Sequence, residues 1–266
     1  MMIRRRSAVV AFEAFGVRIR IACRPASLAE ALAPFLPPDR RACGDSDVQA
    51  SFSLVAAAGG YEVRAGDLLM GSGLDLDVAL GLVDARVRAE VANGTSGWTF
   101  VHAGVVAVGG RALAIPGDSF TGKTTLVRAL IAAGATYYSD EYAVLDDDGK
   151  VHPYPRPLSV RDGYARKGGW EIPPHALGVS VGTEPAVIAV VASAPYRPGA
   201  IWEPQRLSAV NAALALFAHT IPARARPAEV MVVLSLATAG AVLLEGPRGE
   251  AEAVAATLLD ATCRTP

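Results

Sequence analysis

Eight residues near the middle of the chain combine glycine, lysine and threonine at the spacing of a phosphate-binding loop. They run from Gly117 to Thr124 and fit the pattern G-x-x-x-x-G-K-[ST]. Such a loop points consecutive backbone N–H groups and a helix N-terminus at one place, which favours a polyanion. Lys123 would reach the β and γ phosphates, and the Thr124 hydroxyl would bind Mg²⁺. The predicted nucleotide-binding residues are Gly117, Asp118, Ser119, Phe120, Thr121, Gly122, Lys123, Thr124 and Thr125.

The segments around this loop decide whether the pattern is meaningful, because eight-residue matches also arise by chance. Residues 111–115 are predicted as a short buried strand, and residues 125–133 as a helix that ends at Gly134. A strand, a loop and a helix in that order form the setting in which the pattern binds phosphate. The alternative is a glycine-rich turn without a ligand.

Two adjacent acids follow the next predicted strand, at residues 136–138. Phosphoryl transfer needs a carboxylate near the metal and a base that orients or deprotonates the acceptor. Asp140 and Glu141, across from Thr124, could supply both functions, and all three are candidate metal ligands. The alternative is an ordinary solvated turn after a strand.

The composition limits the classes of protein that need consideration. The chain has 266 residues, of which 52% are hydrophobic, so it can bury one or two cores and is not largely disordered. Its 25 Lys and Arg nearly balance its 26 Asp and Glu, which gives no sign of a nucleic-acid partner. The three cysteines lack metal-ligand spacing and are predicted to be inert thiols in a reducing cytoplasm.

Neither a secretory signal nor a membrane span is expected. Glu13 interrupts the apolar residues that follow Arg4-Arg5-Arg6. The longest apolar stretch without charges, residues 230–244, is too short to cross a bilayer. It is predicted to form two buried strands with a turn near Ala239-Gly240.

The first 97 residues predict a small α+β lobe of undetermined role. The predicted elements are a hairpin at 7–22, a helix that starts at a Ser27/Glu30 capping box, strands at 48–55 and 61–64, and a helix at 77–92 that stops at Asn93-Gly94. Residues 98–266 are predicted as the catalytic domain. Its further elements are strands at 105–108 and 186–193 and helices at 208–218 and 250–263.

A segment rich in proline and glycine, residues 151–175, is predicted to lie outside the core and to contact the acceptor. Its cations are expected to be exposed: Arg156, Arg161, Arg166 and Lys167.

The run His102-Ala103-Gly104, the glycine-rich loop and residues 134–141 together resemble the catalytic domain of the HPr kinase/phosphorylase family. The resemblance covers roughly residues 98–200 and extends more distantly to ATP-dependent phosphoenolpyruvate carboxykinase. It is greatest to the HPr-kinase-like proteins of bacterial peptide-modification clusters, some of which phosphorylate a serine of a precursor peptide. It implies an α/β phosphate-loop kinase core of this type, α+β overall with the N-terminal lobe.

The resemblance also implies roles for single residues. Asp140 would be the general base or acceptor-orienting carboxylate, Glu141 its metal or water partner, and His102 would tune the protonation of these acids. A satisfied core histidine is the equal alternative for His102. Arg161 and Arg197 are candidates for stabilising the transferred phosphoryl group or anchoring the acceptor. For both arginines a surface cation is the alternative.

Three features depart from the family pattern. Phe120 stands where the family usually has glycine, and Glu141 where it has a second aspartate. The glutamate-rich, glycine-containing signature of HPr kinases is absent from residues 156–180. This absence argues against HPr as the acceptor and against the reverse phosphorolysis reaction.

The leading hypothesis is therefore an ATP- and Mg²⁺-dependent kinase that transfers the γ-phosphoryl group to a hydroxyl of a peptide, foremost a serine, or of a small molecule. A carboxykinase-like enzyme is one alternative, but the four histidines show no cluster for the metal site that it would need. A nucleotide sensor or scaffold without catalysis is the other. The partners expected are the nucleotide and the acceptor, with no nucleic acid and no membrane, and the hexamers of HPr kinases leave a homo-oligomer open.

Overall fold

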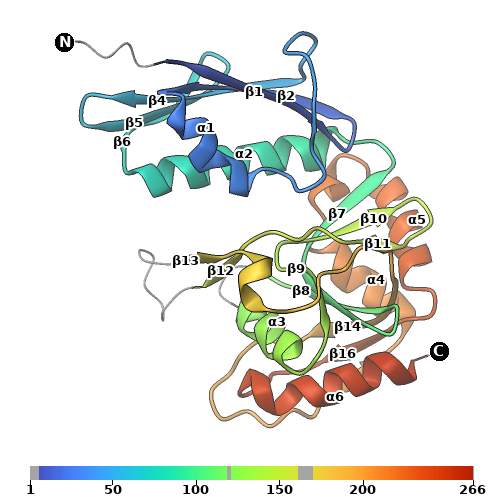
Figure 1. The fold of residues 1–266 in the computed structure, drawn as a ribbon. Helices are drawn as coiled ribbons and strands as arrows, with labels where there is room; N and C mark the ends of the chain where they lie inside the picture. The colour runs from blue at the N-terminus through green and yellow to red at the C-terminus, as the bar shows by residue number, and fades with distance from the viewer. Residues whose placement is uncertain (1–5, 119–120, 161–169, 266) are drawn as a thin grey trace. The chain divides into compact units, whose positions relative to one another are not determined.

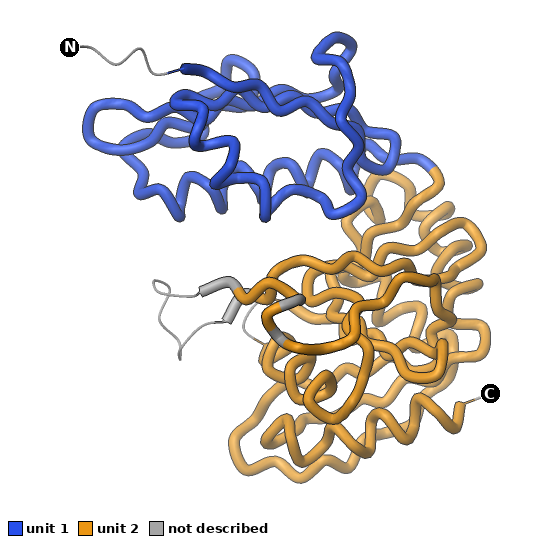
Figure 2. The backbone as a smooth tube through the Cα atoms, viewed as in Figure 1, with its two compact units in different colours: residues 1–96 blue, residues 97–266 orange. Residues whose placement is uncertain are grey.

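The computed structural model is a mixed α/β protein whose chain divides into two compact units, residues 1–96 and 97–266 (Figure 2). It describes residues 6–118, 121–160 and 170–265. Along these residues, none of the helices is both long enough and apolar enough to cross a membrane.

Unit 1 is a six-stranded sheet against which two helices pack (Figure 1). The strand order is β3-β1-β2-β4-β5-β6, and only β2 and β4 pair in parallel. Alternate residues of β2 are buried, from Val17 to Cys23, as expected for a strand with one covered face. The elements are β1 (Ala8–Ala14), β2 (Val17–Arg24), α1 (Ser27–Leu32), β3 (Arg41–Ala42), β4 (Ala50–Ala57), β5 (Gly60–Ala65), β6 (Leu68–Leu74) and α2 (Leu76–Gly94), with a 3₁₀ turn at Ala33–Phe35.

The predicted hairpin, strands and helices of this unit are present, but the capping box predicted at the start of α1 was wrong. Ser27 is the first residue of α1 and makes no capping hydrogen bond, because the preceding residue, Ala26, already has helical dihedrals. α2 stops at the predicted Asn93-Gly94, and Thr95 after it is extended. Strands β3 and β6 were not predicted.

Unit 2 is a sheet of eight strands with helices on both faces (Figure 1). The order is β11-β10-β7-β8-β14-β16-β15, with β9 also paired to β7. β8, β14 and β16 are parallel neighbours. The strands are β7 (Trp98–Val108), β8 (Arg111–Pro116), β9 (Thr136–Ser139), β10 (Tyr142–Asp146), β11 (Val151–His152), β14 (Val187–Ser193), β15 (Gln205–Leu207) and β16 (Val242–Glu245); β12 (Leu158–Val160) and β13 (Trp170–Ile172) pair separately.

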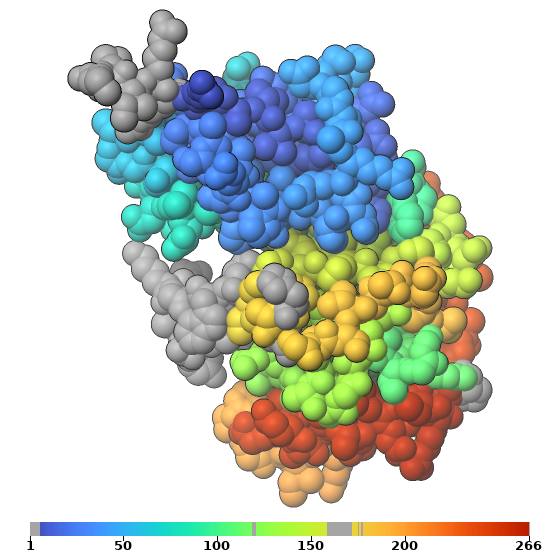
Figure 3. Space-filling view, in the orientation of Figure 1, coloured from blue at the N-terminus to red at the C-terminus, as the bar shows by residue number. Residues whose placement is uncertain are grey.

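Two hydrophobic cores fill the spaces between the sheet and its helices. α3 (Lys123–Ala132) and α6 (Ala251–Arg264) contribute to one core, and α4 (Ala209–Phe217) and α5 (Pro227–Ala237) to the other. α6 buries residues at helical spacing, and its other side forms part of the surface of unit 2 (Figure 3, red). Short 3₁₀ turns occupy Pro174–Leu177 and Ile221–Arg224.

Two predictions about this unit were wrong. Residues 230–237 belong to helix α5 rather than to a strand, because Val230, Val233, Leu234 and Ala237 recur at helical spacing on the buried side. The segment 151–175 is not wholly outside the core, since Arg156 is only 6% exposed. The other cations predicted there, Arg161, Arg166 and Lys167, lie outside the described residues.

Gly104 of β7 allows helix α3 to approach the sheet. A Cβ atom at this position would lie 2.6 Å from Val127 Cγ2 and 3.3 Å from Lys123 Cγ. We expect Gly104→Ala to lower the free energy of unfolding of unit 2 by about 1–3 kcal/mol, because the core there has no room for a methyl group.

Urea unfolding followed by tryptophan fluorescence measures this change, because Trp98, Trp170 and Trp202 all belong to unit 2. Arg128→Ala, on the exposed side of α3, is the control and should change stability by no more than about 0.5 kcal/mol. An unchanged unfolding midpoint in Gly104→Ala would contradict the packing argument.

Candidate functional site

The loop predicted to bind phosphate connects β8 to α3 at one edge of the sheet. Because β14 and β16 run parallel to β8, the chain leaves all three strands at this edge. Ligands of open α/β sheets bind beside the carboxyl ends of such strands. Ser119 and Phe120 lie outside the described residues, so the account of the loop rests on the other predicted positions.

Two glycines of the loop have structural reasons to be glycine. Gly122 precedes α3 with a φ of 84°, a left-handed conformation that favours glycine. A Cβ atom at Gly117 would lie 3.0 Å from Thr121 Oγ1, whose hydroxyl donates to the Asp118 carbonyl at 2.9 Å. The described part of the loop therefore holds its turn through its own contacts.

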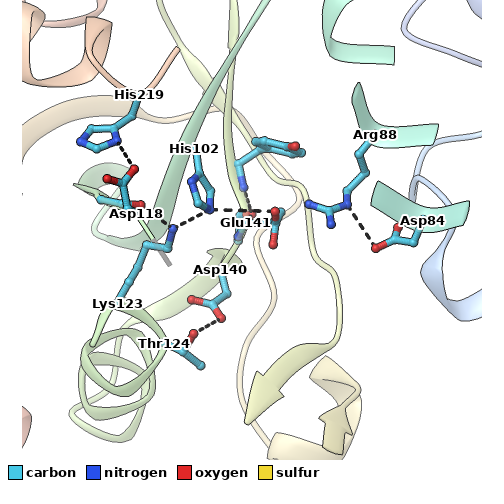
Figure 4. A network of polar contacts seen from close by, with 12 residues as sticks. Asp84, Arg88, His102, Asp118, Lys123, Thr124, Asp140, Glu141 and His219 are labelled. Atoms are coloured by element: carbon cyan, nitrogen blue, oxygen red, sulfur yellow. Dashed lines mark hydrogen bonds and ion pairs between the residues drawn. The ribbon is translucent and has the colours of Figure 1, made fainter. Parts of the chain in front are cut away.

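Lys123 is the first residue of α3, and its side chain is almost wholly buried, with 8% exposed. Its Nζ donates to the Gly117 carbonyl at 3.0 Å and lies 2.8 Å from His102 Nε2 (Figure 4). Burial lowers the pKa of Lys123, although the nearby carboxylates of Asp140 and Glu141 oppose this shift. The ammonium thus lies inside the site, beside the first turn of the helix.

Asp140 lies opposite the threonine of the loop. Thr124 Oγ1 donates to Asp140 Oδ2 at 2.7 Å (Figure 4), whereas the buried Oδ1 has no hydrogen-bond partner within the described parts of the chain. Burial raises the pKa of Asp140 to about 7, even though the Thr124 bond and the charge of Lys123 act in the other direction. One oxygen of this carboxyl group is therefore positioned by the loop, and the other remains available.

A bend between β9 and β10 places both acids in the site. β7 pairs with β9 over Val105–Ala107 and with β10 over Trp98–His102, and the two acids occupy the gap between these ladders. The Ser139 hydroxyl oxygen accepts the backbone N–H groups of Glu141 at 3.1 Å and Tyr142 at 2.9 Å, which fixes the bend. Ser139 preceded the acids in the sequence, but its part in forming this bend was not predicted.

His102 comes from the adjacent strand β7 and links the lysine to the second acid. Its Nε2 lies 2.8 Å from Lys123 Nζ and 4.0 Å from Glu141 Oε1 (Figure 4). If Lys123 is charged and donates, His102 Nε2 accepts, which requires a neutral imidazole. Unlike an isolated core histidine, His102 lies in a network with Lys123 and Glu141.

The other predicted residues differ in how they are placed. Thr125 is exposed on the first turn of α3, and Arg197 is exposed in the loop after β14, where its backbone N–H donates to the Arg248 carbonyl at 2.8 Å. Arg161 lies outside the described residues. The structure therefore brings together Gly117, Gly122, Lys123, Thr124, Asp140, Glu141 and His102, and leaves the side chain of Arg197 exposed to solvent.

Two neighbours of the loop were not predicted as part of the site. His219 Nδ1 lies 3.3 Å from Asp118 Oδ1, and the His219 carbonyl accepts the backbone N–H of His102 at 2.8 Å. Arg248 is buried behind the loop and donates to the Gly122 carbonyl at 2.7 Å. Both residues are more than 90 positions from the loop, and no local pattern marks them.

Thr124, Asp140 and Glu141 supply oxygen ligands of the kind that Mg²⁺ prefers, and Thr124 Oγ1 and Asp140 Oδ2 lie side by side, 2.7 Å apart. The described residues hold no group of three or more His, Cys, Asp or Glu that would bind a metal by themselves. Mg²⁺ usually has only one or two protein carboxylates, and phosphate oxygens supply further ligands.

Comparison with models of protein families finds no match for this chain, and comparison with curated proteins finds none either.

The raised pKa of Asp140 predicts a pH dependence of stability that the variant Asp140→Asn should lack. Since the folded pKa of about 7 exceeds the ordinary value of 3.8, the folded state favours the protonated carboxyl. As the pH rises from about 4 to about 7, the parent should lose stability relative to Asp140→Asn, by up to about 1.4 kcal/mol per pH unit.

Urea unfolding of both proteins across this pH window, with a chelator and without nucleotide, measures the difference. A difference in unfolding free energy that stays constant with pH would show that the Asp140 carboxyl titrates normally.

Proposed function

We propose that this chain is an HPr-kinase-like enzyme that transfers the γ-phosphoryl group of ATP, bound with Mg²⁺, to a hydroxyl group. The foremost acceptor is a serine of a peptide. The contact of Thr124 Oγ1 with Asp140 Oδ2, at 2.7 Å, supports the proposal most strongly. It joins the threonine of a phosphate-loop pattern to a buried acid from the bend between β9 and β10, a pair of the kind that phosphate-loop enzymes use around Mg²⁺.

The phosphates would bind the N–H groups of the loop and of the first turn of α3. Their negative charge would favour the ammonium form of Lys123 and oppose the burial that lowers its pKa. Positioning of this kind, together with electrostatic stabilisation, supplies most of the rate of phosphoryl transfer.

Thr124, Asp140 and Glu141 would hold the Mg²⁺ ion. When bound, this ion neutralises negative charge on the β and γ phosphates.

Asp140 Oδ1 is the proposed proton acceptor. The acceptor oxygen forms a bond to the γ-phosphorus, the bond from that phosphorus to the β–γ bridging oxygen breaks, ADP leaves, and the hydroxyl proton passes to Asp140. The Thr124 hydroxyl holds the other oxygen of this carboxyl group. A pKa of about 7 suits a base that works near neutral pH.

His102 is proposed to help give Asp140 and Glu141 different roles. It lies between Lys123 and Glu141, at 2.8 Å and 4.0 Å. The charge of Glu141 raises the pKa of Asp140, so this ring would link the lysine of the loop to the environment of both acids.

The region 151–205 is proposed to set the identity of the acceptor, and its exposed Arg197 is a candidate anchor for an acidic or phosphorylated group. The described cysteines, Cys23, Cys43 and Cys263, form no disulfide, and we propose a cytoplasmic location. A homo-oligomer, as in HPr kinases, remains part of the proposal.

Transfer of label from γ-labelled ATP to serine-containing peptides tests the function directly. We expect Asp140→Asn to lower the rate of transfer by about 10²–10⁴-fold, because the amide cannot take up the proton. Asp148→Asn, which changes an exposed acid just after β10, is the matched control and should retain the parent rate.

The parent rate in Asp140→Asn would show that the assigned role of this residue is wrong. Binding of Mg-ATP without transfer to any hydroxyl, combined with nucleotide-dependent binding of another protein, would instead favour the sensor alternative.

A further inference from the structure

Arg248 is the largest of the side chains that are almost wholly buried, and only 1% of its surface is exposed. It lies three residues beyond β16, at the edge of the sheet where the phosphate-binding loop leaves β8. The phosphate-loop pattern covers only the loop itself and gives no role to a buried cation at this position.

The guanidinium group is fixed by backbone carbonyls and one ring. Nη2 donates to the Gly122 carbonyl at 2.7 Å, and Nη1 donates to the Gly249 carbonyl at 2.9 Å. Cζ lies 5.6 Å from the centroid of the Tyr196 ring. Nε has no hydrogen-bond partner in the described segments, and the same segments offer no carboxylate in an ion pair with Arg248.

These contacts determine which way the loop's peptide groups point. The Gly122 carbonyl accepts both Arg248 and the Leu126 N–H, the latter at 3.0 Å. Because a trans peptide is planar, with C=O and N–H on opposite sides, the N–H of Lys123 points away from Arg248. The preceding peptide is held in the same way, since Tyr196 N–H donates to the Thr121 carbonyl at 3.1 Å.

Two consecutive N–H groups, those of Gly122 and Lys123, are thus directed away from the contacts behind the loop. Successive N–H groups of this kind form a concavity that binds anions. Gly122 also makes room for the arginine, because a Cβ atom there would lie 2.7 Å from Nη2.

We propose that Arg248 is a positioning residue for the nucleotide: it holds the Gly122 peptide in the phosphate-binding orientation and places a buried positive charge behind the loop. This inference depends on one part of the proposed function, namely that the ligand of the loop is a nucleotide polyphosphate.

Electrostatics supports this role. A buried cation is costly unless an opposite charge compensates it. Burial lowers the pKa of Arg248, and Glu250 and Glu252 only partly oppose the shift. A triphosphate bound at the front of the loop would provide the missing negative charge. A hydrogen bond to a peptide carbonyl also polarises the peptide, so the N–H of Lys123 becomes a stronger donor.

Calorimetric titration with Mg-ATP tests the proposal in three variants. Arg248→Ala should weaken binding by about 10- to 100-fold, as expected for loss of a hydrogen bond from a charged group. Arg248→Lys keeps the charge but cannot reach both carbonyls, so its binding should be weakened less. Arg128→Ala removes an exposed arginine from α3, the helix that follows the loop, and should bind as the parent does.

Added guanidinium ion distinguishes positioning from a purely structural role. It should restore part of the binding in Arg248→Ala, which offers a cavity of the right shape, but not in Lys123→Ala. Parent-like binding in Arg248→Ala, or a loss that guanidinium does not reverse in a folded variant, overturns the proposal.

If Arg248→Ala does not fold, the test rests on Arg248→Lys. An affinity of Arg248→Lys for Mg-ATP equal to that of the parent overturns the proposal. Since the readout is binding, the outcome is separate from catalysis. If the parent binds Mg-ATP but transfers no phosphoryl group, the kinase proposal fails and the role of Arg248 is still decided. If the parent does not bind Mg-ATP, both proposals fail.

Discussion

Burial of a lysine and an aspartate in one small space is the constraint on which the site depends. Lys123 and Asp140 are each only 8% exposed, and neither charge would be tolerated there without partners. Among the described residues the hydrogen-bond partners are few: a carbonyl and an imidazole for the lysine, and a hydroxyl for the aspartate. Burial consequently shifts both pKa values toward the neutral forms. The two opposite charges partly compensate each other, but burial outweighs this compensation, and a polyphosphate with its cation would add an opposite charge beside each of them.

The sheet, rather than the loop alone, makes this burial possible. β7 pairs with β8 on one side and with β9 and β10 on the other, so it lies between the loop and the acids. Gly104 on β7 lets α3 approach closely, and this brings Thr124 near Asp140. The bend at Ser139 then directs the acids out of the regular ladder. Packing of apolar residues thereby determines the distance between the Thr124 hydroxyl and the Asp140 carboxyl group.

The sequence allowed prediction of features that depend on neighbours along the chain. The strand, loop and helix around Lys123 follow from local patterns, and Asp140 lies one helix and one strand further on. Arg248 and His219 were missed because only the pairing of distant strands and loops brings them to the loop. Helix α5 was mistaken for a strand because its exposed face carries Val232 and Leu236, which hide the periodicity of the buried face.

The two sides of the loop have different contacts. Behind it, the Thr121 and Gly122 carbonyls are held by groups from the loops after β14 and β16. In front of it, Lys123, Thr124 and the acids would meet the ligand and do the chemistry. The left-handed turn at Gly122 and these rear contacts are made within the chain itself. Contacts of this kind would lower the cost of ordering the loop on binding. In the proposed kinase, residues behind the loop would control affinity through preorganisation, whereas residues in front would control both affinity and rate.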